Sequence, residues 1–215
     1  MIPVNTPDLS GNEKHYLAAC IDTGWISSEG PFVGQFETAL ANRLGRRHGV
    51  ATCNGSAALD VALQALDLEP GAEVILPTFT IISCLQCILR AGARPVLVDA
   101  DPVTWNMDVS RIESKITPRT RAILAVHIYG LTVDMAAVLA LARRHGLRVI
   151  EDAAEAIGQT CFVDGAHVPC GKIGDISTLS FYPNKHVTSG EGGMVLTDDD
   201  RLSARCRSIR NLCFG

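Results

Sequence analysis

Short apolar runs alternate along the chain with longer segments whose apolar residues recur every three or four positions. Short apolar runs are typical of buried strands, and the longer period is typical of helices packed on one side. We expect strands at 50–53, 73–76, 95–99, 122–126, 148–150, 176–182 and 193–197. We expect helices at 10–24, 31–44, 57–66, 81–90, 135–145 and 202–211, with a further helix carrying Ile112 and Ile116.

This alternation of strands and helices through short links predicts an α/β fold. Such a pattern favours a mostly parallel sheet with helices on both faces and right-handed crossovers, a three-layer α/β/α arrangement. The chain has 215 residues, which is enough for one large domain with a substantial core. We therefore expect a single domain over residues 1–215.

Three segments give more specific expectations. Ser10 and Glu13 form a capping-box pattern at the start of the first helix, whose apolar side should face inward. That side comprises Tyr16, Leu17, Cys20 and Ile21. The fully apolar run at 95–99 predicts a buried parallel strand. Residues 159–174 are expected to be irregular, with a turn at Asp164-Gly165.

Composition and charge exclude several classes of protein. The net charge is −4 and basic residues do not cluster, which argues against a nucleic-acid surface. No stretch approaches the roughly 20 apolar residues of a membrane span. No apolar run follows Met1, so we expect no export signal, a cytoplasmic location and reduced cysteines. Cys84 and Cys87 lie in an apolar helical pattern without a second pair at zinc spacing, which predicts core thiols and no metal site.

Lys185 lies between an apolar run and a glycine-rich turn, in the stretch 180–193. Partial burial of a lysine disfavours its ammonium form and frees the amine to attack a carbonyl. For a lone lysine, a solvated loop position is the more common explanation. The covalent alternative therefore depends on what the rest of the chain supplies.

Two other features complement this lysine. Asp152 directly follows an apolar strand, where a carboxylate is costly unless it is paired. Gly55 and Ser56 follow another strand at the start of a helix, a common position for a phosphate. Taken alone, the aspartate is explained by an N-cap or ion pair, and such turns often bind nothing. Together with Lys185, they suggest a pyridoxal 5'-phosphate site, in which the Ser180 hydroxyl would donate a further hydrogen bond to the phosphate.

Six motifs, in order, strengthen this interpretation. They lie at 23–28, 53–59, 95–108, 126–130, 149–158 and 180–185. On these motifs the chain resembles the sugar aminotransferases of the DegT type, within the fold-type-I pyridoxal phosphate enzymes. The resemblance covers essentially all of the sequence. It implies the large domain of these transferases, which has the aspartate aminotransferase-like α/β/α fold.

The resemblance also implies individual roles. Lys185 would be the Schiff-base lysine and would carry the proton between the cofactor and the sugar carbon. Asp152 would pair with the pyridine nitrogen of the cofactor. Gly55 and Ser56 would bind its phosphate, assisted by Ser180.

Five further positions are assigned by the same resemblance or depart from it. Glu155 stands where many relatives have glutamine and would lie near the oxygen of the cofactor ring. Ile81 replaces the aromatic residue that usually stacks on that ring. His127, Trp25 and His186 are candidate substrate contacts. Alternatively, His127 is a hydrogen-bonded residue at a strand end, and Trp25 packs under the second helix.

The implied reaction moves an amino group from glutamate to a nucleotide-linked 4-keto-6-deoxy sugar, for polysaccharide or glycoside biosynthesis. A homodimer with shared active sites is implied as well. Two alternatives remain. Relatives with histidine in place of the lysine are sugar dehydratases, although Lys185 is retained here. The family's chain is also longer, so we expect its C-terminal small domain to be absent after Gly215. The second alternative is therefore an inactive or regulatory remnant. Residues 1–30 would form the N-terminal helix and substrate loop.

Overall fold

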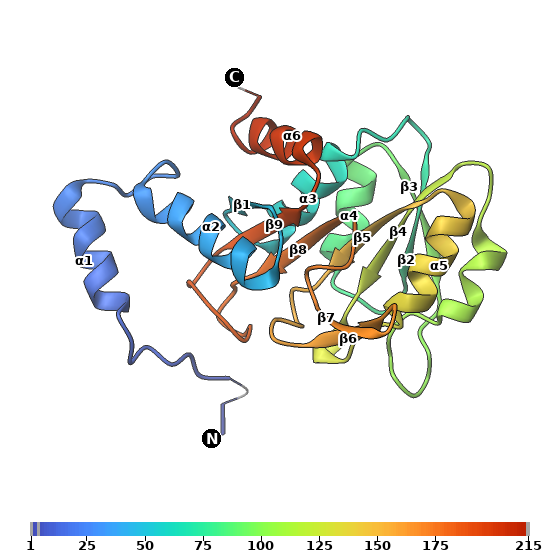
Figure 1. The fold of residues 1–215 in the computed structure, drawn as a ribbon, viewed down its shortest axis with the longest axis horizontal. Coiled ribbons are helices and arrows are strands. Elements are labelled where there is room, and N and C mark those ends of the chain that lie inside the picture. Colours follow the sequence, from blue (N-terminus) through green and yellow to red (C-terminus); the bar gives the residue numbers. More distant parts are fainter. Residues whose placement is uncertain (1, 4, 214–215) are drawn as a thin grey trace.

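The computed structural model describes residues 2–3 and 5–213, and its centre is a seven-stranded sheet (Figure 1). The strand order is β1-β9-β8-β5-β4-β2-β3. The strands are β1 (His48–Thr52), β2 (Glu73–Pro77), β3 (Arg94–Val98), β4 (Thr120–Val126), β5 (Arg148–Asp152), β8 (Ile176–Ser180) and β9 (Gly193–Thr197). Only β9 runs against the others, because it is antiparallel to both β1 and β8. The predicted mostly parallel sheet is confirmed.

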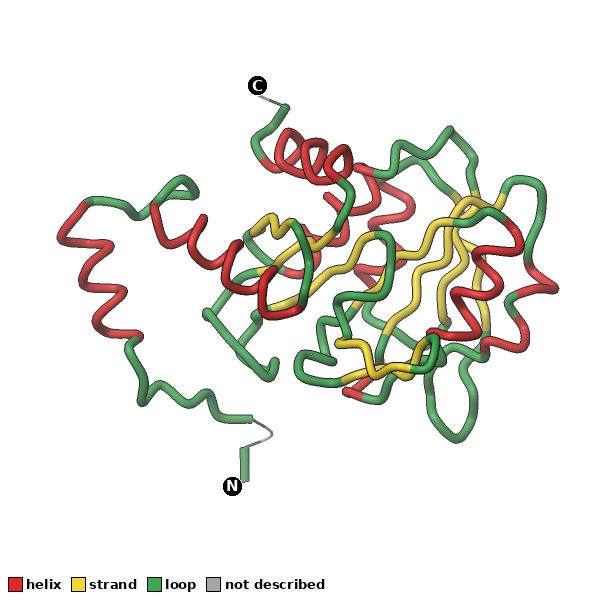
Figure 2. Tube along the Cα trace, viewed as in Figure 1, coloured by secondary structure: helices red, strands yellow, loops and turns green. Residues whose placement is uncertain are grey.

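Helices cover both faces of this sheet, as expected (Figure 2). The α-helices are α1 (Glu13–Thr23), α2 (Pro31–Leu44), α3 (Gly55–Ala65), α4 (Ile82–Arg90), α5 (Met135–His145) and α6 (Asp200–Arg210). Side chains of α2 and α5 pack in one core cluster, and those of α3, α4 and α6 pack in the other. Strand β2 contributes side chains to both clusters, because successive side chains of a strand point to opposite faces. Ile75 belongs to the first cluster, and Val74 and Leu76 belong to the second.

Helix caps lie where the local sequence favours them. The side chain of Asn54 accepts the N–H of Ala57 at the start of α3. The side chain of Asp134 accepts the N–H of Ala137 at the start of α5, and Asp199 caps α6. These caps satisfy N–H groups that the first turn of a helix leaves without partners. The start of α3 is thereby fixed directly after β1, at one edge of the sheet.

The prediction for the first helix is wrong in two respects. Helix α1 begins at Glu13 with Asn12 at its N-cap and no side-chain cap, so the capping box does not form. None of its residues is buried, and Leu17 and Ile21 are 65% and 73% exposed. Figure 1 shows this helix standing away from the sheet. An amphipathic pattern indicates a face that can be covered, but it does not identify what covers it.

Three other expectations are corrected. Residues 159–174 contain a hairpin of β6 (Thr160–Val163) and β7 (Ala166–Pro169), although the predicted turn at Asp164-Gly165 is present. Strand β3 lies at the edge of the sheet and is only partly buried, because only β2 pairs with it. The segment with Ile112 and Ile116 forms two 3-10 turns, η1 (Val109–Arg111) and η2 (Glu113–Lys115), instead of an α-helix.

Across residues 2–3 and 5–213, every helix is too short or too polar to span a bilayer.

Candidate active site

A cavity of about 560 Å³ opens at the carboxyl edge of the parallel strands. Segments that follow β1, β2, β4 and β5 line it, together with the end of β8 and the loop beyond. In open α/β sheets this edge is where ligands bind, because loops from neighbouring strands converge there. Its lining includes Gly55, Ser56, Ile81, His127, Asp152, Glu155, Ser180 and Lys185.

One wall of the cavity is the N-terminus of α3. Gly55 is the first residue of this helix, and its backbone packs directly against Ser180 at the end of β8. A Cβ atom at Gly55 would lie 2.7 Å from the Ser180 Cβ, so glycine is required for this approach. Ser56 presents its hydroxyl to Ser83 at 2.7 Å. The free N–H groups of the first helical turn and the surrounding hydroxyls form a wall suited to an anion.

The close approach at Gly55 gives a stability prediction. We expect Gly55→Ala to lower the free energy of unfolding by about 1–3 kcal/mol, because the added methyl overpacks the contact with Ser180. Urea unfolding of the two chains measures the change. In a Ser180→Gly background, Gly55→Ala should lower the free energy of unfolding by less than it does in the native chain. An equal decrease in both backgrounds would show that the contact is not the cause.

Lys185 and Glu155 meet on another wall. The Lys185 Nζ donates to Glu155 Oε1 at 2.8 Å, and the lysine side chain is only 17% exposed. The other carboxylate oxygen accepts the N–H of Tyr129 at 2.7 Å. Tyr129 has a left-handed backbone with φ of 50°, which turns its N–H toward the cavity wall. Lys185 is therefore a partly buried lysine that a carboxylate orients.

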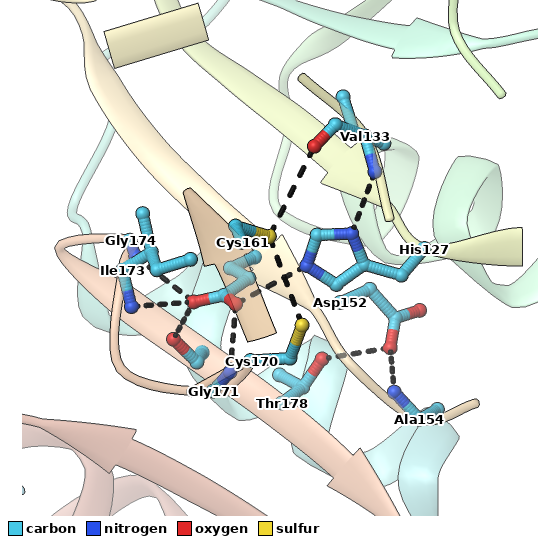
Figure 3. Close-up of polar contacts among 12 residues, drawn as sticks. His127, Val133, Asp152, Ala154, Cys161, Cys170, Gly171, Ile173, Gly174 and Thr178 are labelled. Carbon is cyan, nitrogen blue, oxygen red and sulfur yellow. Dashed lines mark hydrogen bonds and ion pairs between the residues drawn. The ribbon is translucent and has the colours of Figure 1, made fainter. Parts of the chain in front are cut away.

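Asp152 is the buried acid of the cavity (Figure 3). Its Oδ1 accepts the N–H of Ala154 at 3.1 Å and the hydroxyl of Thr178 at 3.2 Å. Among the described residues, its Oδ2 receives only the weaker thiol of Cys84, at 3.4 Å. Burial raises the pKa of Asp152, while these hydrogen bonds oppose the shift. The carboxylate is thus oriented from one side and retains capacity for a cationic N–H partner.

Glu151, the neighbour of Asp152 on β5, points to the opposite face and anchors the strand end. Its carboxylate accepts the N–H groups of Gly171, Ile173 and Gly174 at 2.6, 2.8 and 3.0 Å. It also accepts the Ser177 hydroxyl at 2.9 Å and lies 3.2 Å from His127 Nε2. Burial raises the pKa of Glu151, but these hydrogen bonds, that of His127 foremost, lower it to about 2. The buried carboxylate is therefore charged and holds the strand that carries Asp152.

Of the four remaining predicted residues, two line the cavity and two do not. Ile81 lines the cavity from the N-cap of α4 and is 61% exposed. His127 is fully buried, and both of its ring nitrogens are hydrogen-bonded within the protein, which corresponds to the strand-end alternative. Trp25 and His186 are exposed and do not line the cavity. The structure thus brings eight of the ten predicted residues to the cavity.

Several contacts of the cavity were missed by sequence reasoning. Cys84, interpreted only as a core thiol, is indeed buried, but it also donates to Asp152. Thr178 lies directly across from Asp152 in the parallel pairing of β5 and β8. The signal for Thr178 was its period-two spacing from Ser180, which places both on one side of the strand. No sequence signal indicated Cys84 as a partner, since its contact depends on how α4 packs.

The donor set can be tested for its fit to a pyridoxal phosphate cofactor. That group needs an amine, an acid for its ring nitrogen and an anion site for its phosphate. The same cavity is lined by all three: the partly buried amine of Lys185, the buried carboxylate of Asp152 and the N-terminus of α3 at Gly55. The residues present fit the group. A mostly parallel α/β sheet with this set of residues is the arrangement of the pyridoxal phosphate-dependent transferase fold.

Comparison with known proteins identifies the family. Residues 7–215 match the DegT/DnrJ/EryC1/StrS aminotransferase family, and the chain belongs to this family. The GDP-perosamine synthase of Caulobacter vibrioides is 49% identical over 209 residues, which cover 97% of this chain and 55% of that protein. The chain spans about half the length of the curated relatives that it matches.

Solved structures agree with the fold. The structure of DesI in the presence of its TDP-sugar product matches with a TM-score of 0.86 and 38% identity, covering 98% of this chain and 52% of that chain. The structure of NtdA from Bacillus subtilis with bound cofactor PMP matches with a TM-score of 0.84 and 35% identity, covering 97% of this chain and 48% of that chain. Pyridoxal phosphate is the cofactor of this family.

Proposed function

We propose that residues 1–215 form the cofactor-binding large domain of a nucleotide-sugar aminotransferase. The observation that carries this proposal is the arrangement of Lys185, Asp152 and the N-terminus of α3 around one cavity. Residues 1–30 would supply the N-terminal helix and a substrate loop with Trp25. The family match and the similarity to GDP-perosamine synthase support amino transfer to a sugar.

Each wall of the cavity would hold one part of the cofactor. Asp152 would accept the N–H of the pyridine ring, since the thiol of Cys84 is only a weak donor to its Oδ2. Gly55, Ser56 and Ser180 would bind the phosphate through backbone N–H groups and hydroxyls. When bound, the cofactor supplies a reactive aldehyde and an electron-accepting ring that the protein's side chains lack.

Lys185 would carry the proton during the reaction. Its amine must lose a proton before it can attack a carbonyl or act as a base, and the side chain, 17% exposed, places this amine at the wall of the cavity. Glu155 holds the lysine at 2.8 Å, so we propose that it positions the amine before the cofactor enters. Ile81 would offer an aliphatic surface to one ring face, since it lines the same cavity.

For the substrate, we propose glutamate as the amino donor and a nucleotide-linked 4-keto-6-deoxy sugar as the acceptor. The names of the relatives support a nucleotide sugar, because they include a GDP-perosamine synthase and a TDP-sugar complex. We further propose a cytoplasmic homodimer that shares its active sites. The exposed apolar side of α1 offers a surface for such a partner.

Incubation with nucleotide-linked keto-sugars tests the function. The chain, supplied with pyridoxal phosphate, glutamate and GDP-, TDP- or UDP-linked 4-keto-6-deoxy sugars, is expected to form an amino sugar and 2-oxoglutarate in equal amounts, measured by mass spectrometry. Release of ammonia without a net amino sugar would favour the dehydratase instead. A chain that neither binds the cofactor nor dimerises would support the inactive remnant.

A further inference from the structure

A second group of reactive side chains gathers around His127, which contacts the buried Glu151 (Figure 3). Cys161 belongs to β6, Cys170 follows β7, and His127 follows β4. The ligand atoms of these three residues lie within 4.8 Å of one another, and all three are buried. The two sulfur atoms are 3.7 Å apart, and the Cys161 thiol also lies 3.9 Å from the carbonyl of Val133. Nothing in the proposed transfer reaction uses this cluster.

A metal ion is the first chemistry to consider, and the hydrogen bonds of His127 oppose it. The Nδ1 atom accepts the N–H of Val133 at 3.1 Å, so it carries no proton. In a neutral ring the proton then lies on Nε2, which donates it to Glu151 Oε1 at 3.2 Å. Both ring nitrogens are therefore engaged. Two thiols remain, short of the four ligands that a structural zinc ion requires.

We propose that Cys161 and Cys170 are a redox pair that a hydroperoxide oxidises to an intrachain disulfide. The thiolate of Cys161 attacks one peroxide oxygen and forms a sulfenic acid, and the other oxygen leaves as hydroxide or alkoxide, which takes up the proton that the thiol lost on ionising and becomes water or alcohol. The sulfur of Cys170 then attacks the Cys161 sulfur, forming the S–S bond, and the sulfenic oxygen leaves as water with the Cys170 proton. Two thiols lose two electrons in total, and the hydroperoxide gains them.

The contact between the two sulfurs supports an assignment of the attacking sulfur. Either thiol can be the donor of this hydrogen bond, and the bond with Cys170 lowers the pKa of Cys161 to about 7. The same interaction, added to burial, raises the pKa of Cys170. A thiolate is the form that reacts with peroxide, so the lowered pKa supports Cys161 as the attacking sulfur, and the 3.7 Å contact places Cys170 to resolve it. By contrast, burial raises the pKa of both Cys84 and Cys87, and neither sulfur contacts the other.

The surrounding fold permits the bond to close. The sulfur atoms must approach from 3.7 Å to about 2.0 Å. Cys161 lies on β6 and Cys170 directly follows β7, and this β6–β7 hairpin is a separate two-stranded sheet that pairs with no strand of the main sheet within the described residues. Both cysteines are buried in the core cluster that includes side chains of α5, so the oxidant reaches them through local opening of the hairpin, and this opening also allows the adjustment. Gly171, next to Cys170, donates to Glu151, so the pair also lies beside the strand end that carries Asp152.

Peptide mapping of the full chain tests the proposal. The reduced protein is treated with hydrogen peroxide, denatured in N-ethylmaleimide and digested. We expect a linked peptide pair containing Cys161 and Cys170, a mass loss of two hydrogens and reversal by dithiothreitol. Cys84 and Cys87 should remain alkylated in the same sample. Replacing exposed Cys53 and Cys213 with serine beforehand suppresses links between chains.

Three cysteine-to-serine variants distinguish a specific link between Cys161 and Cys170 from unspecific oxidation of cysteines. Cys161→Ser and Cys170→Ser should each lose the link, whereas Cys206→Ser, which removes a buried cysteine elsewhere, should keep it. If a serine variant does not fold, the map of the native chain decides alone. Full alkylation of Cys161 and Cys170 after peroxide treatment would overturn the proposal. So would one equivalent of zinc that survives dialysis and protects both thiols, since it would identify a metal site.

Discussion

Lys185→Ala is expected to lose covalent capture of pyridoxal phosphate completely and to lower amine transfer by about 10³-fold or more. Lys185 supplies the only amine among the residues that line the cavity. Its removal ends both attachment of the cofactor and the proton transfer that a positioned base typically accelerates by about 10²–10⁴-fold. Borohydride reduction followed by mass spectrometry measures the attachment, as a mass increase of one reduced cofactor on the peptide that contains Lys185.

Lys172→Ala is the matched control for this experiment. Lys172 is also partly buried and paired, with its Nζ 2.7 Å from Asp198, but it lies outside the cavity. Its removal should leave capture and transfer unchanged. Capture of the cofactor by Lys185→Ala at the level of the unmodified chain would show that another amine forms the bond, and the assignment of Lys185 would fail.

Glu151→Gln is expected to lower the free energy of unfolding by about 3–5 kcal/mol, measured by urea unfolding at neutral pH. The carboxylate is fully buried and accepts hydrogen bonds from three backbone N–H groups, from Ser177 and from His127. An amide presents an NH₂ group to some of these donors, which leaves buried polar groups without acceptors. The surface variant Glu113→Gln, which loses exposed pairs with Arg144 and His145, should cost at most about 1 kcal/mol.

The pH dependence of this effect has a defined sign. The pKa of Glu151 is lowered from 4.5 to about 2 in the folded chain. A depressed pKa contributes stability that is fully present above about pH 4.5 and is lost as the pH falls toward 2. The difference between the native chain and Glu151→Gln should therefore shrink from pH 5 toward pH 3. A constant difference over this range would show that shape, and not charge, causes the loss.

Much of the fold could be predicted because its signals are local. The apolar runs placed the strands, and capping side chains such as Asp134 marked where helices begin. The same reasoning brought Lys185, Asp152 and the Gly55-Ser56 turn to one edge, since the carboxyl ends of parallel strands converge. The wrong predictions concern burial, which depends on whether another element covers an apolar surface. The apolar side of α1 remains exposed, and β3 is an edge strand despite its apolar run.

The sequence by itself therefore determined the α/β class, the order of the main-sheet strands and of the α-helices along the chain, and the residue types that meet at the sheet edge. These follow from periodicity and from local hydrogen bonds, which depend on neighbours in the chain. Only the tertiary structure decided that Glu155 holds Lys185, that Cys84 faces Asp152 and that Cys161 meets Cys170. Such contacts join residues distant in sequence, and distances of a few ångströms between side chains depend on how whole elements pack.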